Sequence, residues 1–258
     1  MKKIIIFVTI SCMMFFGLST TAFADKDGSS VQISRESVED YSGTGYANLN
    51  TATDCVNGLI NIVNDPNTNW TSGDNWTNGQ VWENDFTAND SYNSDDQDLF
   101  AYCGHGLLNY GPYLADGTHD SHNVDRREIR WGDRDLEWAL MFTCNFLTPS
   151  LSGSNGIGQM MNGAHVICGY GSVMWVTANG GLTFANQAIT GQSVTNSWAY
   201  YAGYTQPPLQ NQDVKIVVLI HSSTASDRLW GYGTVASDPV SYNSSTSGYY
   251  RIETLIQY

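Results

Sequence analysis

The stretch DLFAYCGHG, Asp98–Gly106, predicts the centre of the fold. Its apolar run Leu99–Cys103 is short and continuous, which is typical of a strand that is covered on both faces of a sheet. A second run of this kind lies within LEWALMFTCNF, Leu136–Phe146. The first run is followed by His105 and the second ends at Cys144. Because ligands bind just outside the carboxyl ends of parallel strands, we expect this base and this thiol at one edge of a sheet.

Further strand-like runs follow at His165–Cys168, Ile216–His221 and Tyr249–Ile256. Between them, apolar residues recur at the spacing of one helical face. These residues form three groups: Ile157, Met160 and Met161; Leu182, Ala185 and Ile189; Val194, Trp198 and Tyr201. Strands that alternate with helices imply crossover connections and a mainly parallel sheet. The predicted fold class is therefore α/β.

Upstream of these runs the sequence is more polar. Residues 48–64 carry apolar side chains on one helical face, and Pro66 ends the predicted helix. Residues 65–98 are rich in Asp, Asn, Thr and Trp, which indicates a long loop with short strands around Val81–Phe86.

The N-terminus has the three parts of a secretory signal peptide. Lys2 and Lys3 precede an apolar stretch, Ile4–Leu18, and small residues at Ala22–Ala24 offer a cleavage site. We therefore expect a signal peptide at 1–24, a polar N-terminal segment at 25–44 that is a flexible entry or an edge element, and one domain at 45–258. This division predicts a secreted, extracellular protein.

The charge balance excludes some partners. The formal net charge is −14, and loss of Lys2 and Lys3 with the signal peptide lowers it to −16. Nucleic acids and anionic membranes need a positive surface, so neither is an expected partner. No segment after the signal peptide is long and apolar enough to span a bilayer. An acidic chain is compatible with a cationic substrate.

Four cysteines follow the signal peptide, and they leave two interpretations open. They are Cys55, Cys103, Cys144 and Cys168. An even number in an oxidising compartment is compatible with disulfides, in three complete pairings. A disulfide between Cys103 and Cys144 would block the thiol that we expect to be reactive.

The residues around the two strand ends suit nucleophilic chemistry. A thiolate attacks acyl carbons, and a histidine such as His105 can protonate the leaving amine. Gly106 lets the backbone approach a substrate closely. The amides of Gly106 and Cys144 are candidates for an oxyanion hole. From spacing alone, the alternative is that His105 caps a glycine-rich turn and Cys144 fills the core.

Four segments resemble caspase-like cysteine peptidases, the group of gingipains, clostripain, legumain and caspases. LFAYCGHG and LMFTCNF are similar to their two signature blocks, and His105 and Cys144 are 39 positions apart in the sequence. GAHVICGYGSVMW and AITGQSVTNSWAYYA are similar to the next strand and helix entry of gingipain-like proteins. The resemblance covers roughly residues 95–205. Thr143 departs from it, because alanine is commonest before the cysteine.

The resemblance implies a caspase-like three-layer sandwich and an exported bacterial cysteine endopeptidase. Cys144 would attack a peptide carbonyl and His105 would protonate the leaving amine, with peptides or proteins as substrates. No cofactor is required. The acidic balance favours cleavage after basic residues. A second hypothesis is a non-catalytic binding or surface module on the same scaffold.

The loop after His105 is rich in metal-ligating residue types. It contains Asp116, His119, Asp120, His122 and Asp125. Asp116, His119 and His122 are weak metal candidates, and a third hypothesis is a metal-dependent hydrolase that uses His105, His119 and His122. Their spacing matches no strong metal motif, so we interpret the segment as a hydrated active-site loop. The run NSDDQD, 93–98, suits a structural calcium ion, and we interpret it as a solvated turn.

Overall fold

The computed structural model describes residues 30–87, 93–153, 156–206, 213–243 and 245–256. The predicted signal peptide at 1–24 lies outside these residues. Within them, seven strands form one sheet in the order β2-β1-β3-β4-β5-β6-β7. Their bounds are β1 Gln32–Ser37, β2 Thr71–Thr77, β3 Leu99–Cys103, β4 Trp138–Phe142, β5 Val166–Tyr170, β6 Val214–His221 and β7 Tyr249–Ile256.

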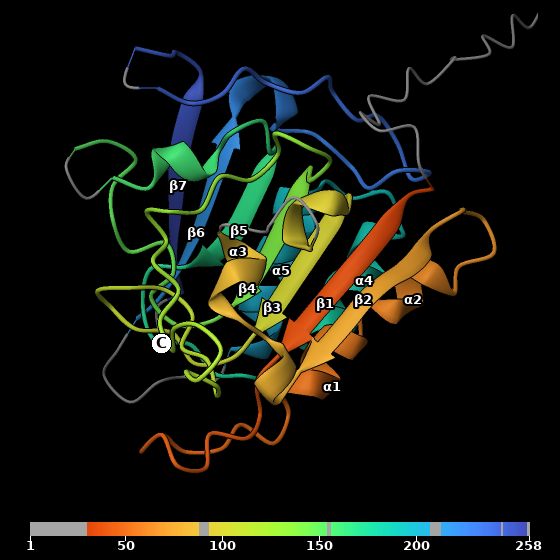
Figure 1. Cartoon of the computed structure of the whole chain (residues 1–258). Coiled ribbons are helices and arrows are strands. Elements are labelled where there is room, and N and C mark those ends of the chain that lie inside the picture. The colour runs from red at the N-terminus through yellow and green to blue at the C-terminus, as the bar shows by residue number, and fades with distance from the viewer. Residues whose placement is uncertain (1–29, 88–92, 154–155, 207–212, 244, 257–258) are drawn as a thin grey trace, which may run out of the picture.

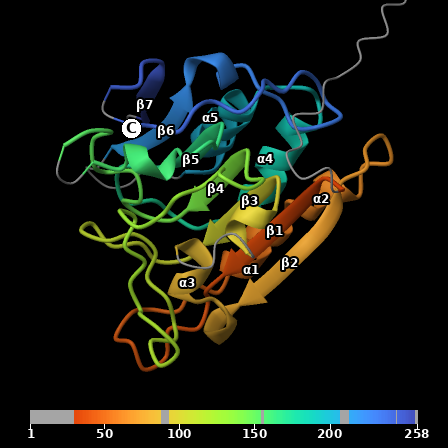
Figure 2. The same cartoon turned by 45° about the horizontal axis from the view of Figure 1, so that its top comes forward.

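The sheet is mainly parallel, as expected. Strands β2, β1, β3, β4 and β5 run parallel to one another, whereas β6 is antiparallel to β5 and to β7. Figure 2 shows the sheet from β2 to β7 as one twisted surface. All residues of β3, β4 and β5 are buried, because both faces of these strands are covered.

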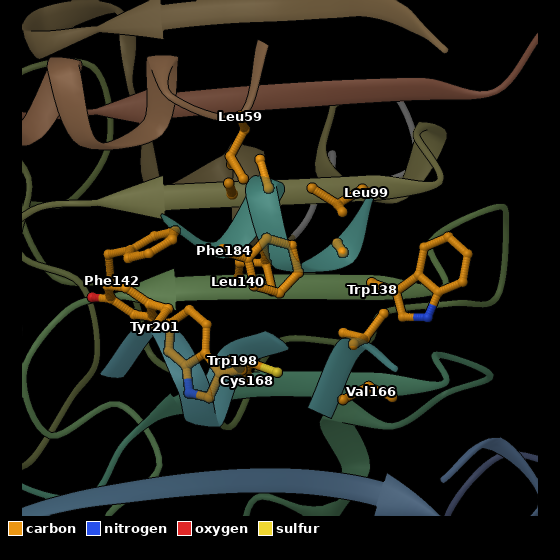
Figure 3. Packing of buried hydrophobic residues seen from close by; sticks show 14 of the residues in the cluster. Leu59, Leu99, Trp138, Leu140, Phe142, Val166, Cys168, Phe184, Trp198 and Tyr201 are labelled. Atoms are coloured by element: carbon orange, nitrogen blue, oxygen red, sulfur yellow. The ribbon is translucent and has the colours of Figure 1, made fainter. Parts of the chain in front are cut away.

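Helices cover one face of the sheet, and they lie behind it in Figure 1. They are α1 Ala52–Asn57, α2 Ile60–Val63, α4 Gly180–Ala188 and α5 Val194–Thr205. Figure 3 shows how Phe184 of α4 and Trp198 of α5 pack on Leu140 and Phe142 of β4. The buried positions of α5 recur every three or four residues, which is the pattern of an amphipathic helix.

The other face is covered by long loops and by the short helix α3, Glu83–Phe86. A second apolar cluster fills this layer, with Phe86 packed edge-on against Phe100 of β3. The α/β class and the three-layer arrangement that we expected are thus confirmed. No helix in the described part of the chain has the length and hydropathy needed to cross a bilayer.

Some expectations for the polar N-terminal half were wrong. Strand β1 comes from the 25–44 segment and lies inside the sheet between β2 and β3, so it is neither an edge nor a flexible entry. Two of its polar side chains find partners on neighbouring elements: Arg35 donates to Asn57 Oδ1 and to Ser72 Oγ at 2.9 Å each, and Ser37 Oγ lies 2.9 Å from Thr53 Oγ1. The sheet therefore begins before residue 45.

Four further elements differ from the sequence prediction. Strand β2 lies in the expected loop region, and the expected strands around Val81–Phe86 are the helix α3 with its flanking turns. The helix predicted at 48–64 is divided into α1 and α2 around Gly58, and the helix expected near Met160 is a single 3₁₀ turn, Gly158–Met160. The strong apolar runs were thus located more accurately than the polar elements.

Candidate active site

The pairing of β3 with β4 brings the two candidate residues to one edge of the sheet. Cys103 and Phe142 are register partners in this parallel pair. His105 and Cys144 each lie two residues beyond those partners, and neighbouring strands are about 4.8 Å apart. In Figure 1 the loops after β1 and β3 gather at the same end of the sheet. The expected juxtaposition of the two strand ends is therefore present.

His105 is held by three groups from the loop after β1. Its backbone NH donates to Tyr41 Oη at 2.8 Å, and its Nε2 lies 2.8 Å from the carbonyl oxygen of Ala47. The ring also contacts the aromatic rings of Tyr41 and Tyr46, with centroid distances of 4.6 and 5.5 Å. Because a carbonyl oxygen only accepts, Nε2 must carry a hydrogen. In the neutral ring Nδ1 is then the proton acceptor.

Cys144 is half-buried, and its sulfur contacts the segment after β5. Sγ accepts from the backbone NH of Met174 at 3.3 Å and lies 3.5 Å from the Met174 carbonyl oxygen. Burial raises the pKa of the Cys144 thiol, while the backbone amides of Met174 and of Cys144 itself act to lower it. The resting group is therefore a neutral thiol that a base must deprotonate.

Gly106 packs directly on the turn that carries Cys144. A Cβ atom at position 106 would overlap the carbonyl oxygen of Cys144, and it would also press on Thr143 Oγ1. The side chain of Thr143 is fully buried. Only glycine therefore lets the loop after His105 reach the segment that holds the thiol, and the close approach of Gly106 to a substrate stays a prediction.

Arg126 ties the two candidate loops together. Its guanidinium NH groups donate to the carbonyl oxygens of Asn145 (2.7 Å) and Phe146 (3.2 Å), and also to that of Leu108. Asn145 and Phe146 follow Cys144, and Leu108 follows His105. The side chain is only 4% exposed. Arg126 lies later in the same β3–β4 connection as Leu108, so its guanidinium joins the start of that connection to the turn after Cys144.

A cavity of about 680 Å³ opens between the same two loops. Leu108–Tyr110, just after His105, form one part of the wall, and Thr148–Ser150 with Ser152 and Gly153, just after Cys144, form another. Arg126 and Arg127 complete the lining. The volume lies within the range of small-ligand sites. The cavity is therefore lined by residues that follow His105 and Cys144 by three or more positions, and neither of these two residues is part of the lining.

The weak metal candidates are not brought together. The ring of His119 stacks on Trp82 at a centroid distance of 3.7 Å, whereas that of His122 stacks on Tyr113 and its Nδ1 lies 2.9 Å from the Leu114 carbonyl oxygen. Asp116 accepts from Thr118. Among the residues that the structure describes, no group of three His, Cys, Asp or Glu side chains is arranged to hold a metal ion. These side chains organise the loop.

The other acidic residues of these segments also have protein partners. Asp120 Oδ2 accepts from the backbone NH of Asn84 at 3.0 Å, and Asp125 binds Arg127. Within the 93–98 run, Asp95 is buried and accepts from the backbone NH groups of Gly132 and Arg134. That run is therefore a buried connection between two loops, and our interpretation of it as a solvated turn was wrong.

All four cysteines of the described chain are free thiols. Cys55, Cys103 and Cys168 are fully buried, and only Cys144 is partly accessible. Burial and the neighbouring thiol of Cys55 raise the pKa of Cys103. Cys103 is thus placed against helix α1, and in this state Cys144 is not in a disulfide.

Sequence reasoning missed two parts of this arrangement. The carbonyl oxygen of Ala47 orients the imidazole of His105, but a backbone carbonyl has no residue-type signal. Arg126 was overlooked because it lies in a loop, 18 positions before Cys144. Its signal was one of four arginines in a segment rich in charged residues, 125–135, which is also typical of a solvated surface.

Comparison with solved structures finds a distant likeness. A secreted C11 cysteine protease from Bacteroides thetaiotaomicron, solved with an irreversible peptide inhibitor, matches with a TM-score of 0.43 and 13% identity. The match covers 74% of this chain and 66% of that one, so the chain spans just under two thirds of that neighbour. No curated protein matches the chain. A family model described as "Domain of unknown function (DUF6345)" matches residues 35–254, and the chain therefore belongs to that family.

Proposed function

We propose that this protein is an exported bacterial cysteine peptidase in which Cys144 is the nucleophile and His105 the general acid and base. The observation that carries the proposal is the β3–β4 register, which places both residues two positions beyond paired strand ends. The contact of His105 Nε2 with the Ala47 carbonyl supports it further. A nucleophile, a base and a third group that orients the base are the parts that covalent catalysis requires.

The proposed reaction has two stages. His105 Nδ1 takes the thiol proton of Cys144 while Sγ attacks the peptide carbonyl carbon, and the tetrahedral oxyanion accepts hydrogen bonds from the amides of Gly106 and Cys144. The imidazolium then gives its proton to the leaving amine, and the C–N bond breaks to leave a thioester on Cys144. In the second stage His105 deprotonates water, which hydrolyses the thioester and regenerates the thiol.

The proposal also covers the substrates, the partners and the location of the protein. Peptides or proteins are the proposed substrates, nucleic acids and membranes are not expected partners, and secretion rests on the signal-like residues 1–24. No cofactor is needed for the two stages. The predicted preference for basic residues remains a prediction, and none of the described residues that line the cavity is acidic.

Peptide hydrolysis by matched variants tests the proposal. Cys144→Ala and His105→Ala should each lower kcat/KM on a peptide-library substrate by at least about 10³-fold, because each removes a reacting group. His221→Ala is the control, since His221 ends β6 and its Nδ1 contacts Ser223 rather than the candidate site. We expect wild-type kinetics from it. Turnover by folded Cys144→Ala at the wild-type rate would refute the proposal, whereas the binding-module hypothesis predicts no hydrolysis by any form.

A further inference from the structure

We infer that the cavity lined by Arg126 and Arg127 binds an acidic side chain of the peptide close to the cleaved bond. This inference rests on the proposed function, because it names the substrate class of that site. It also opposes the basic preference that the overall charge favours. Net charge describes the whole surface, whereas substrate choice depends on the few groups that line the site.

The lining has a positive charge in a strongly acidic chain. The protein has 25 Asp and Glu residues and 11 Lys and Arg residues. Two of those 11 line this cavity, while its described lining contains no carboxylate. If charged side chains were placed at random, acidic residues would be about twice as common here as basic ones. The local excess of positive charge therefore predicts an anionic ligand.

The buried guanidinium of Arg126 is the stronger of the two groups. Its described hydrogen-bond partners are three carbonyl oxygens, from Leu108, Asn145 and Phe146, and none of the ion pairs in the described chain includes it. A buried charge is costly unless an opposite charge compensates it. Burial lowers the pKa of Arg126 to about 10, so the group is still protonated at neutral pH. The charge of Asp125 acts on Arg126 without contacting it, so a carboxylate in the cavity would supply the direct partner that the described chain does not.

Arg127 adds a second cation at the more exposed rim. Its guanidinium binds the Asp125 carboxylate, with Nε at 2.8 and 3.0 Å from the two oxygens. Asp125 therefore compensates Arg127, and the charge of Glu128 also acts on it. Arg126 is the cation of the lining that takes part in no ion pair of the described chain, and its charge favours an acidic side chain over the neutral amide and repels a lysine.

The remaining wall suits a peptide better than a small inorganic anion. Leu108 and Tyr110 present apolar surface and are 56% and 43% exposed, while Asn109, Thr148 and Ser150 offer hydrogen-bonding groups. A volume of about 680 Å³ accommodates more than one side chain. Arg126 lines the cavity and donates to the carbonyl oxygen of Asn145, the residue after Cys144, so a peptide that contacts Arg126 would lie near the Cys144 turn.

Matched peptides test this inference. A peptide library is first cleaved and the cut sites are mapped by mass spectrometry. Peptides with Glu, Gln or Lys at the selected position are then compared, and we expect kcat/KM to be at least about tenfold higher for Glu than for Gln, and lowest for Lys. The Glu/Gln ratio should fall in Arg127→Gln and in folded Arg126→Gln. It should not change in Arg130→Gln, because Arg130 is an exposed arginine outside the described lining.

The outcomes separate this inference from the proposed function. Cleavage with equal rates for Glu and Gln, or a ratio unaffected in both arginine variants, overturns the acidic site and leaves the peptidase intact. If no peptide is cleaved, the proposed function fails, and the acidic site is tested by fluorescence anisotropy of the labelled peptides with Cys144→Ala. Tighter binding of the Glu peptide that weakens in Arg127→Gln supports the site, and equal or absent binding overturns it.

Discussion

The backbone of Gly106 lies against the carbonyl oxygen of Cys144, with no room between them for a side chain. This contact joins the loop after β3 to the turn after β4. It therefore couples the position of the imidazole to that of the thiol. A disturbance at Gly106 should change their geometry while the sheet remains intact.

We predict that Gly106→Ala lowers kcat/KM by about 100-fold or more, because a displacement of about 1 Å in a reacting group costs this much. Gly203→Ala is the matched control: Gly203 lies in α5, and a Cβ there meets nothing within 4 Å. It should retain activity and gain about 0.5–1 kcal/mol in stability. Steady-state kinetics and thermal unfolding measure both effects. Full activity in Gly106→Ala would show that the contact is irrelevant to the site.

The pH dependence of thiol alkylation should reflect the buried environment of Cys144. Burial raises the pKa of Cys144, so its thiolate forms at higher pH than that of an exposed cysteine, for which the usual pKa is about 8.5. The rate of reaction with iodoacetamide, followed by intact mass, should still be rising above pH 8.5. Cys144→Ala supplies the background, because the other three described thiols are fully buried. A plateau already reached at pH 7 would contradict a neutral resting thiol.

Loss of the Arg126 side chain should destabilise the fold as well as the site. Arg126→Met leaves three carbonyl oxygens without this donor, and we expect it to lower the free energy of unfolding by about 2–4 kcal/mol. Arg130→Met, at an exposed position of the same loop, should change it by less than about 0.5 kcal/mol. Urea unfolding distinguishes the two. Equal stability of both variants would mean that Arg126 does not hold the loops together.

Asp95 should make the protein less stable as the pH rises. Burial and the side chain of Asp133 raise the pKa of Asp95 to about 9, while the backbone NH groups of Gly132 and Arg134 oppose the shift. The stabilisation from its bound proton is complete below the unfolded pKa of about 4 and is lost as the pH rises to about 9. Asp95→Asn carries a neutral amide that does not ionise in this pH range. The difference in Tm, variant minus wild type, should therefore increase from pH 5 to pH 9. A constant difference would contradict a raised pKa of Asp95.

The apolar runs allowed most of the sheet to be predicted from the sequence. Leu99–Cys103 and Tyr249–Ile256 are strands with the expected bounds. The first is fully buried, as a continuous apolar run requires, whereas the second is largely exposed at the edge of the sheet. The sequence QISRES of β1 did not predict an inner strand, since its Arg35 and Ser37 find partners in Asn57 and Thr53 only after folding. The direction of β6 was also not predictable, because a buried strand has the same composition in either orientation.

The candidate site was predictable to a similar extent. The strand-end positions of His105 and Cys144 follow from two apolar runs. The contact of Gly106 with the Cys144 carbonyl was not predicted, because the sequence argument concerned only the approach of the backbone to a substrate. The Ala47 carbonyl that orients the imidazole depends on a fold-back of the loop after β1, which sequence periodicity does not describe. The cavity also required the structure, because its walls come from three separate segments.

Detection of a covalent intermediate tests the central claim most directly. The protein is mixed with an activated ester of a peptide that it cleaves, the reaction is quenched with acid, and the adduct is located by peptide mapping. We predict one acyl group per molecule, as a thioester on Cys144, which is absent in Cys144→Ala and which hydrolyses more slowly in His105→Ala. An acyl group on another residue, or peptide cleavage with unmodified Cys144 at every quench time, would contradict the account.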